Sequence, residues 1–194
     1  MKPYIPSILP LQKSTFDFEK IIKSVGEANA SLSEYNGLLQ GLVNPAILLS
    51  PLTSQEAVIS SKIEGTQATL EEVLEHEAGQ EFGELKSEDI KEILNYRLAI
   101  TVCRTHVRKH KISLSLILKL HEILMEEVRG HEKDRGKFRK DQNWIGAPGT
   151  PIEQATFIPP NPLQLNDYLK NWEEYLPFDE FDPIVQTAIA HAQF

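Results

Sequence analysis

SEDIKEILNYRLAITVCRTHVRKH, residues 87–110, decides the fold class of this chain. Its apolar residues return every three or four positions, so that a helix would gather on one face Ile90, Ile93, Leu94, Leu98 and Val102. A helical period also runs through the stretches 16–42, 54–65, 69–79, 114–130, 162–176 and 182–194. The sequence therefore predicts a mainly α-helical fold.

One stretch breaks the helical period. GKFRKDQNWIGAPGTPIEQATFIPP, residues 136–160, has glycine and proline in its middle and short apolar flanks. This pattern is typical of a β-hairpin. We predict one hairpin over about 136–160, with Phe138 and Trp144 in its core.

Capping residues mark the ends of the expected helices. Starts are indicated at Thr53 or Ser54, at Thr69 with Glu72, and at Asp182, and stops at Gly65, Gly79 and Gly130. The last helix opens on Asp182-Pro183 but reaches Phe194 with no glycine, asparagine or basic last turn. We expect this helix to continue beyond Phe194.

The composition narrows the class of protein. The chain has 194 residues and a net charge of -8, which disfavours nucleic acid as a partner. Two segments, 104–111 and 135–140, are locally basic despite this negative net charge. We interpret the first of them as a solvated helix end. No apolar run approaches the roughly 20 residues that cross a membrane. The single Cys103 cannot form an internal disulfide. We expect a cytoplasmic protein without a membrane span.

SSKIEG, residues 60–65, ends the expected helix 54–65 in an unusual way. Ser60 and Glu64 are four residues apart and share one helix face. Gly65 removes a side chain next to the carboxylate, either as a helix stop or as a place where another group comes close. Spacing alone leaves two readings open, a polar face with a glycine stop and a functional carboxylate.

The stretch SSKIEG resembles the pattern [S/T]-x-x-x-E-[G/N] of Fic (Fic/Doc) family proteins that carry an N-terminal inhibitory helix. Further stretches in the same order are similar to this family: SEDIKEILNYRLAI, ISLSLILKLHEILM, GKFRKDQNWIG with ATFIPPNP, and AHAQF. The resemblance implies a Fic-type helical bundle with one β-hairpin flap, truncated at its C-terminus. It divides the chain into an N-terminal helical extension, 1–86, with the inhibitory helix at about 54–65, and the first part of the Fic core, 87–194.

The family's catalytic motif, H-P-F-x-[D/E]-G-N-G-R-x-x-R, does not occur in the chain. By resemblance it would begin just after Phe194, so no catalytic residue is assigned here and His191 is interpreted as a core or helix-face histidine. The implied reaction is transfer of AMP from ATP to a Ser, Thr or Tyr hydroxyl of a target protein, with Mg²⁺ on the phosphates. We expect no metal site within the chain itself.

The resemblance assigns control and positioning to this chain. Glu64 would pair with the second arginine of the missing motif and hold ATP in an unproductive pose, Ser60 would anchor the inhibitory helix, and Gly65 would leave room for the carboxylate. On the flap, Thr156, Phe157 and Ile158 are the candidates for docking the target protein by strand addition; a plain hairpin strand is the other reading.

Two functions from different classes remain open. One is an autoinhibited protein adenylyltransferase of which this chain is a part, inactive by itself. The other is a non-catalytic regulatory or interaction module that binds a partner through the inhibitory helix or the flap. The sequence that follows Phe194 separates them, and an oligomer fits either.

Overall fold

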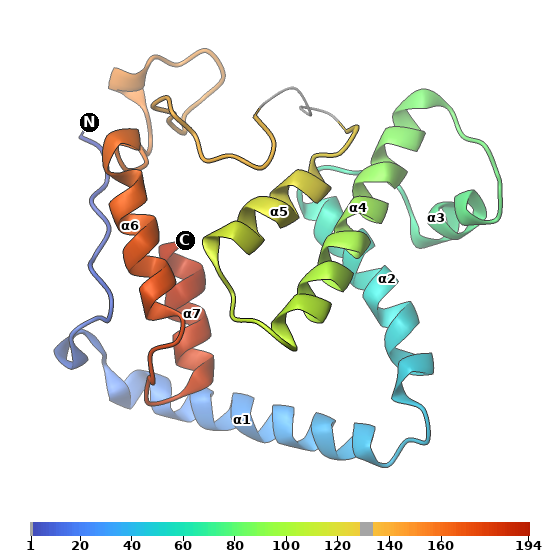
Figure 1. Cartoon of the computed structure of the whole chain (residues 1–194), viewed down its shortest axis with the longest axis horizontal. Coiled ribbons are helices and arrows are strands. Elements are labelled where there is room, and N and C mark those ends of the chain that lie inside the picture. The colour runs from blue at the N-terminus through green and yellow to red at the C-terminus, as the bar shows by residue number, and fades with distance from the viewer. Residues whose placement is uncertain (1, 129–133) are drawn as a thin grey trace. The chain divides into compact units, whose positions relative to one another are not determined.

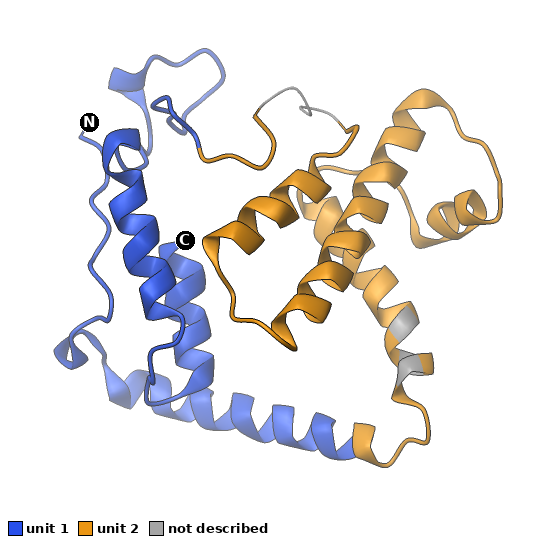
Figure 2. Cartoon of the chain, viewed as in Figure 1, with its two compact units in different colours: residues 1–38, 139–194 blue, residues 39–138 orange. Residues whose placement is uncertain are grey.

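The computed structural model describes residues 2–128 and 134–194. Within them it is mainly helical, as predicted (Figure 1). The α-helices are α1 Phe18–Gln40, α2 Pro45–Ile63, α3 Leu70–Glu77, α4 Glu84–Val107, α5 Leu114–Leu124, α6 Pro162–Tyr175 and α7 Pro183–Gln193, and short 3₁₀ turns span Lys13–Thr15 and Ile152–Gln154. The chain divides into two compact units, residues 1–38 with 139–194 and residues 39–138 (Figure 2).

In the unit formed by residues 39–138, α4 is the central helix and packs against α2, α3 and α5 (Figure 1). The core consists of Ala57, Ala68, Val73, Ile90 and Ile93, all at most 3% exposed. The predicted apolar face of residues 87–110 thus supplies the two central isoleucines. Burial of such side chains stabilises the unit by about 1.5–3 kcal/mol for each large residue.

In the other unit, α6 and α7 pack side by side. Trp172 of α6 is buried and donates its Nε1–H to the Ala190 carbonyl oxygen of α7 at 2.8 Å. Its ring contacts that of Phe194 in a tilted arrangement, with ring centroids 4.9 Å apart. Asp182 caps α7 as predicted, because its carboxylate accepts from the Ile184 N–H at 2.7 Å. The same carboxyl group binds Asn29 of α1 at 2.8 Å.

The predicted start of the helix that carries SSKIEG is wrong. α2 begins at Pro45 and runs through Pro51, and the hydroxyl of Thr53 donates to the Leu49 carbonyl oxygen at 2.8 Å within the helix instead of capping a new one. Pro45 is tolerated because the first helical position needs no N–H. α2 therefore opens on one proline and contains a second, Pro51, inside it.

The capping box of α3 is confirmed, but α5 is shorter than predicted. Thr69 N–H donates to the Glu72 carboxylate at 2.7 Å, and Glu72 N–H donates to the Thr69 hydroxyl at 3.3 Å. α5 ends at Leu124, where the buried amide of Asn95 on α4 donates to the Leu124 and Glu126 carbonyl oxygens at 3.4 and 2.8 Å. The stop predicted at Gly130 lies outside the described residues.

The predicted β-hairpin over 136–160 is not seen. The described residues contain no strand there, only an isolated antiparallel bridge between Ile145 and Phe157. Proline at 148, 151, 159 and 160 cannot donate to a ladder, and a 3₁₀ turn occupies Ile152–Gln154. Trp144 is also not a core residue, since it is 42% exposed and donates its Nε1–H to the Thr150 carbonyl oxygen at 2.9 Å.

Candidate functional site

The C-terminal end of α2 is closed by a defined capping motif. Gly65 has φ +109°, its N–H donates to the Lys62 carbonyl oxygen at 3.1 Å, and the Thr66 N–H donates to the Ser61 carbonyl oxygen at 3.2 Å. This pair of bonds around a left-handed glycine is a Schellman motif. Glu64 occupies the position between the last helical residue, Ile63, and that glycine.

Two faces of α2 have different environments. Ser54, Ala57 and Ser61 are buried and form the face turned to the core, where α2 packs on α4. Glu56, Ser60 and Glu64, each four residues apart, form a second face on which both carboxylates are exposed. The Ser60 hydroxyl donates to Glu56 Oε1 at 2.6 Å, one turn before Glu64.

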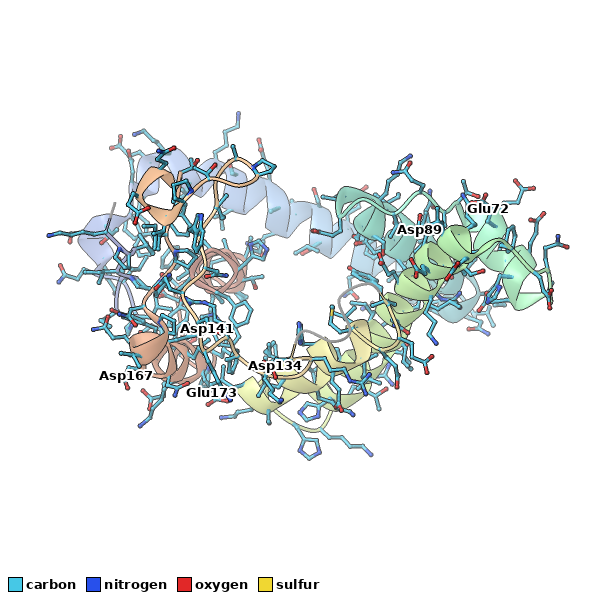
Figure 3. All side chains as sticks on the ribbon, turned by 90° about the horizontal axis from the view of Figure 1, so that it is seen from above. Glu72, Asp89, Asp134, Asp141, Asp167 and Glu173 are labelled. Atoms are coloured by element: carbon cyan, nitrogen blue, oxygen red, sulfur yellow. The ribbon has the colours of Figure 1, made fainter. Side chains whose placement is uncertain are left out.

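The turn that follows Glu64 is pinned to α4, which is also linked to α3; Asp89 of α4 and Glu72 of α3 are labelled in Figure 3. Asp89 of α4, only 7% exposed, accepts from the Gln67 N–H at 2.6 Å. Lys86, one turn before it on α4, donates to the Gln67 carbonyl oxygen at 3.4 Å and forms an ion pair with Glu72 of α3 at 3.0 Å. The backbone just after Glu64 is therefore held by residues that lie 19 and 22 positions further along the chain than Gln67.

Glu72 of α3 has a lowered pKa. The Thr69 backbone N–H, and next the Lys86 ammonium, hold the pKa of the Glu72 carboxyl below its usual 4.5. Both partners stabilise the charged form of the carboxylate. The link between α3 and α4 therefore persists at neutral pH.

The candidate docking segment, residues 156–158, belongs to the other unit. The Ile145 carbonyl oxygen accepts from the N–H groups of Thr156 at 2.7 Å and Phe157 at 3.2 Å, and the Ile145 N–H donates to the Phe157 carbonyl oxygen at 2.8 Å. Two residues opposite one is the bonding of a β-bulge. Thr156 and Phe157 are exposed, whereas Ile158 is buried at 2% exposure.

The unit of α6 and α7 also contains an apolar cleft of about 740 Å³. It lies between α1, α7 and the N-terminal arm, which we define as residues 2–17, before α1. Its lining includes Leu11, Phe16, Val25, Ile184 and Ile189, and none of the described side chains that line it is charged. A nucleoside triphosphate such as ATP requires cationic or N–H-rich surroundings for its phosphates. This cleft is therefore suited to apolar contacts and not to ATP.

Among residues 2–128 and 134–194, no three His, Cys, Asp or Glu side chains gather as they would to hold a metal ion. Nor does the described part of the chain contain a helix with the length and apolar character to cross a membrane.

Two family models match the chain. The model of the Fic/DOC family N-terminal region matches residues 22–103, and the Fic/DOC family model matches residues 111–194. The chain belongs to the Fic/DOC family. The predicted family is thereby confirmed; Glu64 lies inside the first match and the candidate docking segment, residues 156–158, inside the second.

The candidate residues of SSKIEG and of 156–158 were predicted from the sequence, but the residues that bond to these segments were not. Asp89 lies 22 residues from Gln67, and no local pattern pairs the two. The first residues of the chain contain Pro3, Pro6 and Pro10 and have no periodic pattern that would predict their contacts.

Proposed function

We propose that this chain is the regulatory and target-docking part of an autoinhibited protein adenylyltransferase. The reaction would transfer AMP from ATP to a Ser, Thr or Tyr hydroxyl of a target protein, with a new bond from the hydroxyl oxygen to the α-phosphorus and pyrophosphate as the leaving group. Membership of the Fic/DOC family supports this class of function. The observation that carries the inhibitory role is the exposed carboxylate of Glu64 at the end of α2.

Glu64 does not stabilise the helix that presents it. The C-terminus of a helix carries partial negative charge, so a carboxylate there costs about 0.3–1 kcal/mol. A residue that works against its own helix is expected where it serves a function. The proposal gives Glu64 an arginine of the catalytic motif as its partner, a charge-assisted and often bidentate contact.

The inhibitory role also requires that the carboxylate be held in place. The capping motif at Gly65 sets the direction of the chain, and the buried Asp89 fixes the backbone of Gln67. A fixed backbone at this point reduces the conformational entropy that the segment loses when Glu64 pairs with an arginine. We therefore assign Gly65 to the helix cap, and Ser60 to the face that it shares with Glu56.

The target protein would dock on residues 156–158 through its main chain. Strand addition uses backbone groups for affinity and makes few demands on the sequence of the bound segment. This fits a segment that holds a target hydroxyl near a nucleotide. Thr156 and Phe157 are accessible, and the buried Ile158 anchors the segment.

ATP and Mg²⁺ belong to the proposed reaction, but the described residues supply no cluster of ligands for the metal. We therefore derive no catalytic step from the side chains of this chain. Its contribution in the proposal is inhibition through Glu64 and positioning of the target.

The experiment uses the complete reading frame that contains residues 1–194. The purified protein is incubated with cell extract and ATP labelled on the α-phosphate, and AMP transfer is compared for the parent, Glu64→Gly, Glu64→Gln and the control Glu75→Gln, an exposed carboxylate of α3. Loss of a charge-assisted contact of about 1.5–3 kcal/mol predicts an increase of roughly 10- to 100-fold in both Glu64 variants and none in the control.

Equal transfer by the parent and both Glu64 variants would overturn the inhibitory role. If no variant transfers AMP, the non-catalytic interaction module becomes the better reading. The 194-residue chain, whose sequence lacks the catalytic motif, is expected to transfer none.

A further inference from the structure

The N-terminal arm lies against the candidate docking segment. The Tyr4 N–H donates to the Ile158 carbonyl oxygen at 2.8 Å. The ring of Tyr4 contacts that of Phe157, with centroids 5.8 Å apart. A segment at the start of the chain thus uses the same kind of contact, main chain to main chain, that a docked target would use.

The arm takes the edge that Ile145 leaves open. Ile145 occupies one edge of the docking segment through the N–H and carbonyl groups of Phe157. Successive residues of an extended chain direct their hydrogen-bonding groups to opposite edges. The Ile158 carbonyl therefore belongs to the second edge, where an added strand would pair, and Tyr4 is bonded to it.

The arm is held firmly at one end and lightly at the other. Leu9 is buried, its N–H and carbonyl groups both bond to the Asn171 side chain at 2.8 and 2.9 Å, and the Ser7 carbonyl oxygen accepts from Gln193 at 2.8 Å. In contrast, Tyr4 is 50% exposed and Ile5 is 75% exposed. Residues 3–5 can therefore leave the docking segment while residues 7–9 stay bound.

The composition of the arm limits how strongly it can pair. Pro3 and Pro6 have no N–H to donate, so only Tyr4 and Ile5 between them can donate to the edge. A short strand of this kind is a weak competitor, which a longer target strand can displace.

We propose that residues 3–5 are an internal occupant of the target-docking edge, and that a target strand must displace Tyr4 from Ile158 before it pairs there. This inference rests on the proposed function for the role of the edge, but not for the contact itself. It makes the arm a second level of control, which acts on the target, whereas Glu64 acts on the nucleotide.

The test is a binding measurement with the 194-residue chain. The probe is a fluorescent peptide of the arm's own sequence, KPYIPS (residues 2–7), and its affinity is compared for the parent, a variant that lacks residues 1–5, Tyr4→Pro, and the control Ile8→Ala, an exposed arm residue. The deletion and Tyr4→Pro each remove the hydrogen bond and the ring contact by which the arm competes with the peptide. We therefore expect both variants to bind the peptide about 3- to 10-fold more tightly than the parent does. Ile8→Ala should bind as the parent does.

Equal affinity of the parent, the deletion and Tyr4→Pro would overturn the proposal. Tyr4→Pro leaves the Leu9 and Ser7 anchors in place, so it remains informative if the deletion fails to fold. Slowed hydrogen exchange of the Tyr4 amide in the parent is also expected, and exchange at the rate of a free peptide would overturn the contact. Neither measurement uses a nucleotide, so its failure is distinct from failure of the Glu64 test.

Discussion

Replacement of Asp89 by alanine should destabilise the unit that presents Glu64 by about 2 kcal/mol. A hydrogen bond to a charged group contributes about 1.5–3 kcal/mol to stability. The bond from the Gln67 N–H to Asp89 is short, at 2.6 Å, and Asp89 is only 7% exposed, so we place its contribution in the upper part of that range, at about 2.5 kcal/mol. The higher helix propensity of alanine offsets about 0.5 kcal/mol of this loss of stability. Asp89→Asn keeps a neutral oxygen acceptor and should cost about 1 kcal/mol.

The assay is urea unfolding followed by far-ultraviolet circular dichroism, together with hydrogen exchange of the Gln67 amide. The matched control is Thr101→Ala, an exposed site on the same helix, with an expected change within about 0.5 kcal/mol. In Asp89→Asn the Gln67 amide should exchange about fivefold faster. An Asp89→Ala protein within about 0.5 kcal/mol of the parent would refute the assignment of Asp89 as the residue that pins the turn.

Two glycine substitutions should change the free energy of unfolding in opposite directions. Gly65→Ala should destabilise the protein by about 1–2 kcal/mol because residue 65 has a left-handed backbone, although the space for an added Cβ is open. Gly37→Ala inside α1 should stabilise it by about 0.5–1 kcal/mol. Urea unfolding measures both, and a shift of the same sign would contradict the role of φ at Gly65. Burial, aided by the Glu180 carboxylate, raises the pKa of Tyr175 to about 12. Since the unfolded tyrosine has a pKa near 10, this contribution to stability is complete below pH 10 and is lost between pH 10 and about 12. Tyr175→Phe should flatten the fall of the unfolding free energy over that range, and an unchanged slope would count against it.

The helical period and the caps at Thr69 and Asp182 were reliable guides because both are local. The face of residues 87–110 supplies Ile90 and Ile93 to the core, and Thr69 and Asp182 cap the helices that they were expected to cap. Each of these signals depends on residues within about four positions of one another. Such contacts form wherever the segment folds.

The predictions failed where distant contacts compete with local signals. α2 continues through Pro51 because its buried face packs on α4, which outweighs a proline in the early turns. The segment 136–160 has the composition of a hairpin, yet its prolines and the bulge opposite Ile145 leave a single bridge. Composition shows that a segment turns, but not how many ladder bonds it keeps.

The candidate site shows the same division. SSKIEG marked Glu64 and Gly65 from the sequence, and the structure adds the capping motif around Gly65. Asp89 lies 22 residues from Gln67, and Tyr4 lies far along the chain from Ile158. No local sequence pattern could therefore predict either contact.

The sequence by itself determined the mainly helical fold class, the caps at Thr69 and Asp182, and the family. The tertiary structure alone decided that the turn after Glu64 is pinned by α4 and that the N-terminal arm lies on the docking segment. The physical reason is that such contacts form only after the chain has met the entropic cost of closing long loops, so they depend on the packing of the whole unit and not on neighbouring residues.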